Sequence, residues 1–289
     1  MPKHRLACFI ISVILPMLLG AATRGQQPTL AKSAETAQSD DFSLKPPADI
    51  SRLSRRRVWF TAYIDYLVDQ DPTAEAVPIM NDKEQSFGIG LSHLDWCKAA
   101  NEGTITVLLK SRQTRSFNFA GVGSHQITDC SDVLRGFKPS AVVPINKSLF
   151  SELPSEAPFG FGVAQPHSRD SYRLIPGRSI AIDLSDDGLI KVGEVLYIPR
   201  LKGVPVMLPD GRIVHHDGYV MAVDKVSACS GGKNMPKDCN INHLDYFKGR
   251  SRSDKLPAQL TSDPANPIDA FTVSDPLIVA KLLAEHSKE

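Results

Sequence analysis

Short apolar runs bounded by polar and turn residues dominate the second half of the chain. Three of them, Ser179–Ile182, residues 194–198 and residues 219–223, are rich in Val, Ile, Leu and Tyr and have the length of strands. In the first half, residues 58–68 have the aromatic and aliphatic density of a longer strand that opens the folded domain. The pattern therefore predicts a mainly β protein.

Between these runs the pattern changes twice. Residues 91–100 predict a short helix that passes, through a turn at 101–103, into a strand over 104–109. We expect residues 86–132 as a whole to be an elaboration of the main domain that lines one side of a substrate groove. Residues 138–178 are rich in turn residues, and their pattern predicts surface loops rather than regular elements.

The C-terminal segment, residues 251–289, begins as a polar, turn-rich tail. Apolar positions then recur at helical spacing over 274–286, which predicts a terminal helix. Ser274 can cap its first turn, and Pro276 suits the first helical positions.

The N-terminus has the pattern of a secretory signal peptide. Basic residues precede an apolar run over 6–19, and small residues follow it, so we expect residues 1–22 to be removed. The run is shorter than the ~20 apolar residues of a bilayer span and contains Pro16, so we expect no membrane span after cleavage. Residues 23–50 are polar and predict a disordered tether, which leaves 51–250 as the folded domain.

Composition narrows the class of protein. The 289 residues are 42% hydrophobic and 22% charged, which is typical of a globular protein, and the net charge of +1 argues against nucleic-acid binding. The signal peptide predicts export, and we expect secretion across the inner membrane to the periplasm or cell envelope. We expect a monomer.

Four cysteines remain after the signal peptide. In an exported chain they predict two disulfides with three possible connectivities, of which we favour the sequence-adjacent pairs Cys97–Cys130 and Cys229–Cys239. A zinc site is the alternative, but neither pair has the close spacing that zinc sites use. His215, His216 and Asp217 are adjacent along the chain, which makes a shared metal ion difficult in a strand, so we expect no metal.

Three aspartates follow or occupy the apolar runs. Asp183 comes directly after the first run, Asp224 comes directly after the third, and Asp245 lies in the apolar context His-Leu-Asp-Tyr-Phe. Asp also initiates turns and caps elements, so spacing alone leaves a purely structural reading open.

The segments around these acids, AIDLS, VGEVLYIP, DGYVMAVD and NHLDYFKG, resemble the 3D domain, which is named for three aspartates. The same domain forms the catalytic core of the MltA type of lytic transglycosylase. The likeness is strong over residues 180–249 and extends over 59–249 if WFTAY is the opening strand, where TAY is similar to the first strand of double-psi barrels. The resemblance implies a double-psi β-barrel, here with a disulfide-stapled elaboration and a C-terminal helix.

The resemblance implies a peptidoglycan lytic transglycosylase, which cleaves between N-acetylmuramic acid and N-acetylglucosamine and leaves a 1,6-anhydro end. Asp245 matches the residue that acts first as acid and then as base, and Asp224 and Asp183 match the other two acids. Such an enzyme needs no metal or organic cofactor, and its partner is the glycan strand. The candidate sugar contacts are Tyr63, Lys225, Asn242 and His243.

One departure leaves a second class of function open. Asp224 and Asp245 lie 21 residues apart, about twice the family's usual spacing, because a segment bounded by Cys229 and Cys239 is inserted between them. The alternative is therefore a non-catalytic protein that binds wall glycans or acts as an envelope scaffold.

Overall fold

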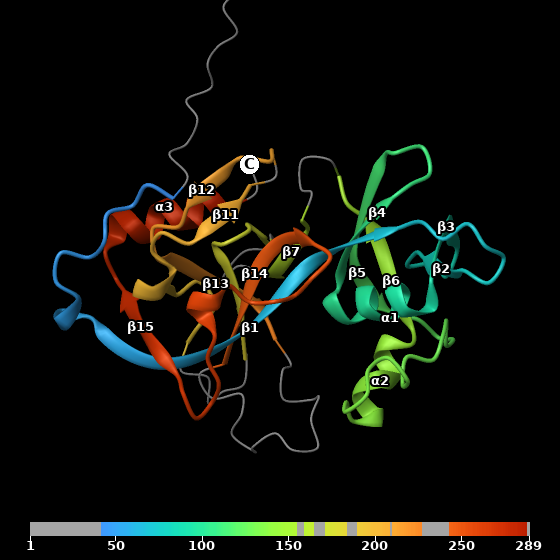
Figure 1. The fold of residues 1–289 in the computed structure, drawn as a ribbon, viewed down its shortest axis with the longest axis horizontal. Coiled ribbons are helices and arrows are strands. Elements are labelled where there is room, and N and C mark those ends of the chain that lie inside the picture. Colours follow the sequence, from blue (N-terminus) through green and yellow to red (C-terminus); the bar gives the residue numbers. More distant parts are fainter. Residues whose placement is uncertain are drawn as a thin grey trace, which may run out of the picture. The chain divides into compact units, whose positions relative to one another are not determined.

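The computed structural model describes residues 42–154, 159–164, 171–183, 190–208, 210–226 and 243–287. All of these belong to one compact unit, Asp40–Glu289. The described chain is mainly β with a C-terminal helix, as the sequence predicts (Figure 1). Among these residues no helix is both long and apolar enough to cross a bilayer. The predicted signal peptide lies outside them.

Six strands pair in a closed ring. Starting from the long strand β1, each pairs with the next, and the last returns to β1, with parallel pairs at β1–β14 and β9–β13 and antiparallel pairs elsewhere. In ring order the strands are β1 (Ser54–Asp69), β14 (His243–Ser251), β9 (Ser179–Ile182), β13 (Tyr219–Lys225), β10 (Val195–Tyr197) and β15 (Ile268–Val273). A closed ring leaves none of these strands with a free edge.

The apolar runs are continuous because both faces of the ring are buried. In β13, Val220 and Ala222 join an apolar cluster to which all six ring strands contribute. Tyr219, Met221 and Val223 point to the opposite face and pack in a second cluster with residues of the C-terminal helix. A strand covered on both sides has a run of apolar residues instead of an alternating pattern.

A second part of the unit continues from the far end of β1. There β1 pairs with β4 (Thr104–Leu108), followed by β5 (Thr114–Val122) and β6 (Ser148–Glu152), beside the hairpin of β2 (Val77–Met80) and β3 (Ser86–Leu91). Helix α1 (His93–Glu102) packs on these strands within a core of its own. The sequence prediction of a helix followed by a strand is confirmed.

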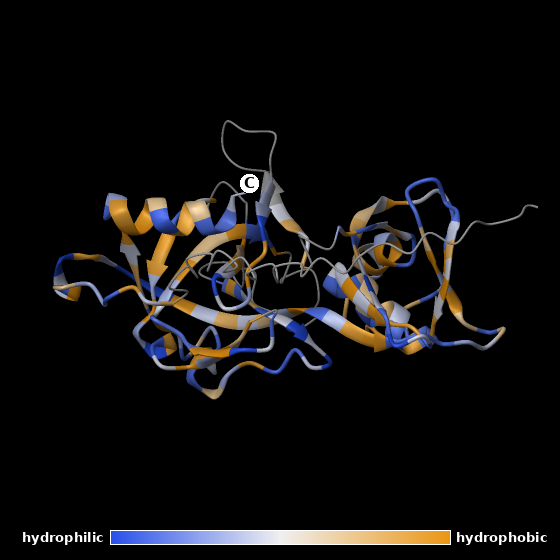
Figure 2. Cartoon of the chain, turned by 90° about the horizontal axis from the view of Figure 1, so that it is seen from above, coloured by the Kyte–Doolittle hydropathy of each residue, from blue (hydrophilic) through white to orange (hydrophobic). Residues whose placement is uncertain are grey.

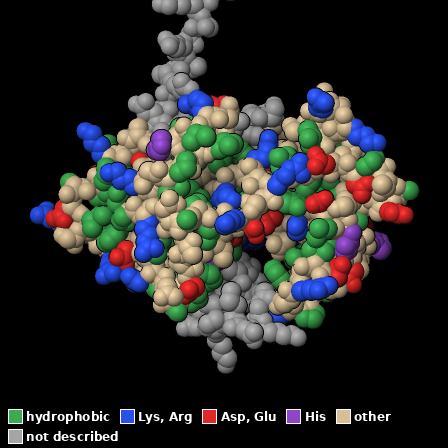
Figure 3. All heavy atoms as spheres, viewed as in Figure 1, with side chains coloured by type: hydrophobic (Ala, Val, Ile, Leu, Met, Phe, Trp, Pro, Cys, Tyr) green, Lys and Arg blue, Asp and Glu red, His purple; other side chains and the backbone are tan. Residues whose placement is uncertain are grey.

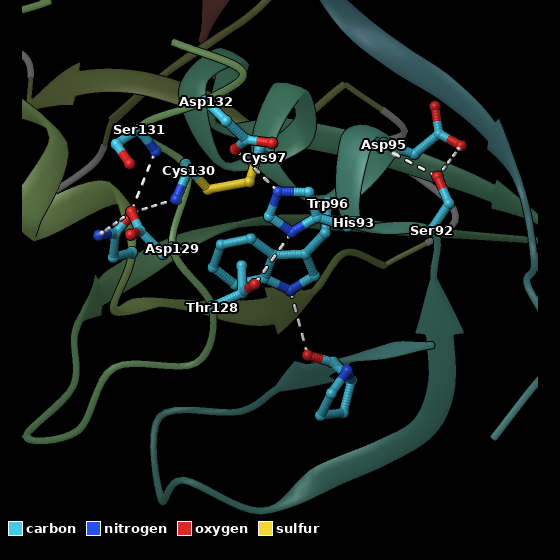
Figure 4. The surroundings of a disulfide bond; sticks show 12 residues. Ser92, His93, Asp95, Trp96, Cys97, Thr128, Asp129, Cys130, Ser131 and Asp132 are labelled. Atoms are coloured by element: carbon cyan, nitrogen blue, oxygen red, sulfur yellow. Dashed lines mark hydrogen bonds and ion pairs between the residues drawn. A yellow bond between two sulfur atoms is a disulfide. The ribbon is translucent and has the colours of Figure 1, made fainter. Parts of the chain in front are cut away.

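The predicted disulfide Cys97–Cys130 is present and joins α1 to the segment after β5 (Figure 4). Both cysteines are buried, and beside them the Trp96 indole Nε1 donates to the carbonyl of Pro78 at 3.1 Å. The disulfide therefore holds α1 to the segment after β5, and the Trp96 hydrogen bond holds it to the hairpin of β2 and β3. The pair Cys229–Cys239 lies outside the described residues.

The prediction of loops over 138–178 is wrong. This region contains helix α2 (Pro139–Ile145), strand β6, and the hairpin of β7 (Phe161–Ala164) and β8 (Ser171–Arg173). Pro139 occupies the first turn of α2, where proline's missing N–H costs nothing, so it begins a helix instead of preventing one. High proline content was therefore a poor indicator of loops here.

The predicted terminal helix is α3 (Pro276–His286). Figure 2 shows apolar and polar positions alternating on its turns, as expected for a helix that packs one face on the ring. Its cap is Asp275, whose carboxylate accepts from the N–H of Leu277 at 2.9 Å, and not Ser274 as predicted. Both residue types favour this position, and the cap lies one residue later than expected.

The folded contacts begin before residue 51. Phe42 is buried and lies 4.0 Å from the Arg178 guanidinium, and the N–H of Leu44 donates to Asp217 at 3.0 Å. Residues 42–50 thus pack on the ring. The smaller elements are η1 (Ile50–Arg52), η2 (Pro199–Leu201), β11 (Pro205–Met207), β12 (Ile213–His215) and η4 (Ala258–Leu260).

The His-His-Asp run begins at the last residue of β12 and leads into β13. His216 Nε2 donates to the carbonyl of Gly177 at 2.6 Å, and Asp217 pairs with the buried Arg178. These side chains therefore serve the packing of the ring.

Candidate active site

The strand register brings two of the predicted acids into one row. Asp224 on β13 and Asp245 on β14 both pair with Ala181 on β9, and Asp245 also pairs with Thr61 on β1. Neighbouring strands lie about 4.8 Å apart, so the backbones of the two acids are about 10 Å apart. Ala181 stands between them and carries only a methyl group, which leaves the space above it open.

This row forms one wall of a cavity of about 620 Å³. Thr61, Ala181, Asp224 and Asp245 line it from the ring, and Glu102 of α1 lines it from the second part, together with residues of α2. A second cavity of about 620 Å³ adjoins it and shares Tyr63, Glu102, Asp224 and Lys225 among its lining residues. We call the two together the acid cleft. In the space-filling view, acidic and basic side chains gather around a hollow near the centre of the face (Figure 3).

Asp245 is held by a chain of polar contacts from β1. The Thr61 hydroxyl donates to Asp245 Oδ1 at 2.8 Å and lies 2.8 Å from Nε2 of His243. Burial, with smaller contributions from the charges of Asp224 and Asp254, raises the pKa of Asp245 to about 7, against the lowering effect of the Thr61 hydrogen bond. Near neutral pH a large share of Asp245 therefore keeps its proton.

His243 lies between Trp59 and the Thr61 hydroxyl and contacts both. Its ring stacks on Trp59 with centroids 4.1 Å apart, and burial lowers its pKa to about 4, so the imidazole is neutral. A neutral ring with its proton on Nε2 donates to Thr61, and Thr61 then donates to Asp245. His243, which was predicted as a sugar contact, is buried and lies 2.8 Å from the Thr61 hydroxyl.

Asp224 has a similar environment with a smaller shift. Burial raises its pKa to about 6, while the N–H of Lys225, at 2.8 Å from Oδ1, and the nearby Tyr63 hydroxyl lower it. The Tyr63 hydroxyl is buried and makes no hydrogen bond of standard geometry to any residue that the structure describes. Tyr63 and Lys225 line both cavities, so two of the predicted contacts do border the cleft.

Asp183 and Asn242 are the remaining predicted site residues. Asp183 follows the end of β9 and lies near enough to His243 to affect its pKa, but the described lining of the cavity includes Asp224 and Asp245 without Asp183. Asn242 lies outside the described residues. The structure thus brings together two of the three aspartates.

The sequence prediction missed one acid of the cleft. Glu102 was assigned to a turn, but it is the last residue of α1, and its Oε2 accepts from the N–H of Ile64 at 3.0 Å. Burial, with smaller contributions from the charges of Asp245 and Asp254, raises the pKa of Glu102 to about 8, against the lowering effect of the Ile64 hydrogen bond. An acid at the C-terminus of a helix is also unfavourable when ionised. The position of an acid directly before Gly103, at the predicted end of the helix, was the signal in the sequence that could have identified Glu102.

No family model matches the sequence, and no curated protein matches it. Among solved structures, the chain is similar to MltA of Escherichia coli with bound chitohexaose, at 15% identity and a TM-score of 0.42, over 76% of this chain and 72% of that chain. It is also similar to a membrane-bound lytic murein transglycosylase from Agrobacterium tumefaciens, at 15% identity and a TM-score of 0.41, over 77% of this chain and 75% of that chain. The similarity to MltA from Neisseria gonorrhoeae has 12% identity and a TM-score of 0.41, over 76% of this chain and 72% of that chain. These similarities are weak, so the function below is inferred from the cleft.

Proposed function

We propose that this protein is a peptidoglycan lytic transglycosylase in which Asp245 is the catalytic acid and base. The observation that carries the proposal is a carboxyl group with a pKa of about 7 on the wall of a cleft large enough for sugar rings. Cleaving a glycosidic bond requires an acid that is still protonated near neutral pH. The resemblance of the segments around Asp183, Asp224 and Asp245 to the 3D domain supports the same assignment.

In the first step the neutral Asp245 donates its proton to the glycosidic oxygen. Oδ1 already accepts from Thr61, so the transferable proton sits on Oδ2. The bond between C1 of N-acetylmuramic acid and the leaving oxygen breaks, and positive charge develops at C1. The leaving N-acetylglucosamine takes the proton.

In the second step the 6-hydroxyl of the same muramic acid attacks C1. Asp245, now ionised, accepts the hydroxyl proton and returns to its starting state, so one residue serves as acid and then base. The product is a 1,6-anhydro ring, and no water is consumed. No second carboxylate is needed as a nucleophile.

Asp224 has a different role in this proposal. Its pKa of about 6 is lower than that of Asp245, so it ionises first and leaves Asp245 as the proton carrier. From the far side of Ala181, its negative charge stabilises the positive charge at C1. Asp183, near His243, is proposed as an orienting charge. Tyr63, Lys225 and Asn242 are the proposed sugar contacts.

The insertion between the two acids does not separate them. β13 and β14 both pair with β9 in the register that brings Asp224 and Asp245 to either side of Ala181. This supports an enzyme over a binding protein that has lost turnover. The non-catalytic glycan-binding or scaffold protein remains the competing function.

We further propose that the closed ring of six strands is a double-psi barrel. Two parallel pairs, β1–β14 and β9–β13, within an otherwise antiparallel ring support it. The N-terminal pattern supports export to the periplasm or cell envelope, where a monomer would meet the glycan strands.

The test is mass spectrometry of the soluble products after incubation of the mature protein with purified peptidoglycan. We expect 1,6-anhydro-N-acetylmuramic acid products that are absent with Asp245→Asn. Products with free reducing ends would indicate a hydrolase instead. Retained binding in a glycan pull-down without any product would favour the non-catalytic function.

A further inference from the structure

Glu102 is fixed at the point where the two cavities of the cleft meet. It lines both cavities, and its Oε2 is held by the N–H of Ile64, where the register between β1 and β14 shifts between Tyr63 and Asp65. That N–H bonds to a side chain from α1 instead of a neighbouring strand. The carboxyl group is therefore anchored through one oxygen, and its orientation in the cleft is defined.

The other oxygen, Oε1, makes no hydrogen bond within the described part of the chain, although the residue borders both cavities. Among the described residues, the charged groups that act on Glu102 are Asp245 and Lys248 on β14 and Asp254 just after it. The hydroxyl groups of Tyr66 and Tyr63 on β1 also lie near Glu102. Two of the three charges are negative, and the helix end adds partial negative charge. These surroundings favour the neutral carboxyl.

We propose that Glu102 is a substrate-binding residue that donates a hydrogen bond from Oε1 to the carbonyl oxygen of an N-acetyl group on a sugar bound in the cleft. A neutral carboxyl can donate, whereas a carboxylate can only accept. The amide carbonyl is the strongest neutral acceptor on an N-acetylated sugar. Glu102 would thus select N-acetylated glycans over glycans with hydroxyls at the same position, and this selection rests on the proposed function.

Burial with these neighbours gives Glu102 a pKa of about 8, which makes the donor sensitive to pH. Affinity for an N-acetylated glycan should fall from pH 7 to pH 9 as the proton is lost. Glutamine reproduces the neutral form at every pH, because its amide oxygen accepts from the Ile64 N–H and its amide nitrogen donates to the ligand.

The experiment measures the affinity of chitohexaose and of cellohexaose, which lacks the N-acetyl groups, for the full mature protein. We expect Glu102→Ala to weaken chitohexaose binding about five- to tenfold and cellohexaose binding by less than about twofold. Glu102→Gln should bind chitohexaose with the affinity of the parent at pH 7. Its affinity should stay constant from pH 7 to pH 9, whereas the affinity of the parent falls. With peptidoglycan, Glu102→Ala should raise KM and leave kcat nearly unchanged.

Two outcomes would overturn the assignment. One is equal weakening of both hexasaccharides by Glu102→Ala, which would indicate only the structural bond to Ile64. The other is a pH dependence in Glu102→Gln that matches the parent, which would assign it to Asp245 or Asp224. Asp254→Asn is the matched control, since it removes a charge from the same cavity and should retain the pH-dependent loss. Product formation by the parent and its absence in Asp245→Asn test the proposed function separately.

Discussion

Asp217 and Asp245 are two aspartates of the same ring with opposite affinities for the proton. Burial raises the pKa of each, but Asp217 also accepts two hydrogen bonds from the Arg178 guanidinium and two from the backbone N–H groups of Tyr219 and Leu44, and its pKa ends below the ordinary value. Asp245 accepts one bond from the Thr61 hydroxyl, and its charged neighbours are acids. The nearby charges, rather than burial, decide which aspartate stays ionised.

The two aspartates therefore do different work. Asp217 joins the N-terminal residues 42–44 and the ring, and Arg178 extends the contact to Glu285 on α3 at 3.2 Å. Within the described part of the chain, no cation forms an ion pair with Asp245, which borders an open cavity. The following variants test this difference, beginning with the largest expected effect.

Replacing Asp245 by Asn should abolish the chemistry without harming the fold. We expect product formation from peptidoglycan to fall by about 10²- to 10⁴-fold, the range for loss of a general acid. The rate of release of anhydro products, followed by mass spectrometry, gives the effect. Unchanged rates in the variant would mean that another group is the acid.

Replacing Asp217 by Asn should act on stability. The Arg178 charge would stay buried with only Glu285 opposite it, so we expect a loss of about 3 kcal/mol in the free energy of unfolding. Urea denaturation measures it. Asp210→Asn is the control, since that exposed carboxylate also pairs with an arginine, Arg212, and should leave the midpoint unchanged. Equal midpoints for both variants would contradict the structural role of Asp217.

Removing the disulfide should weaken the wall of the cleft that α1 provides. Cys97 and Cys130 are 33 residues apart, and a cross-link of this kind contributes about 2–4 kcal/mol. The double variant Cys97→Ser/Cys130→Ser should unfold at lower urea concentration than the parent, and reductant should have the same effect on the parent. A parent that is insensitive to reductant, with all its thiols free, would refute the bond.

The contribution of Asp245 and Asp224 to the free energy of unfolding should fall as the pH rises, whereas that of Asp217 should fall as the pH falls. Asp245 and Asp224 have pKa values above that of the unfolded chain, so the stability they contribute is complete below about pH 4 and is lost as the pH rises to about 7. The variant Asp224→Asn/Asp245→Asn should equal the parent at pH 4 and exceed it at pH 8 by about 2 kcal/mol, a reduced value because both groups are partly exposed. Asp217 has a lowered pKa, so its contribution is lost as the pH falls.

Local sequence patterns predicted the parts of this protein that depend on short segments. Continuous apolar runs predicted β1, β9, β10 and β13, whose faces are covered, and apolar spacing predicted α1 and α3. The ring strand β15 was missed, because it lies in the segment predicted as a polar tail. The positions of Asp224 and Asp245 next to such runs identified the acids of the cleft, and the cysteine spacing identified Cys97–Cys130.

What the sequence could not predict depends on contacts between distant segments. The Glu102 carboxyl group is held in the cleft by the N–H of Ile64, 38 residues earlier, a contact that no local pattern encodes. His243 turned out to be buried behind Thr61 because β14 pairs with β1, which no local pattern encodes. Helix α2 was hidden by prolines that begin a helix as readily as they end one.

The pairing of Thr61 with Asp245 also has a consequence for folding. The two residues are 184 positions apart, and they belong to neighbouring strands. Contacts of such high sequence separation form slowly, because a long loop must close before any of them stabilises the chain. Asp245 therefore gains its hydrogen bond from Thr61 only when two strands far apart in the sequence have paired, which we expect to be a late step in the folding of the cleft.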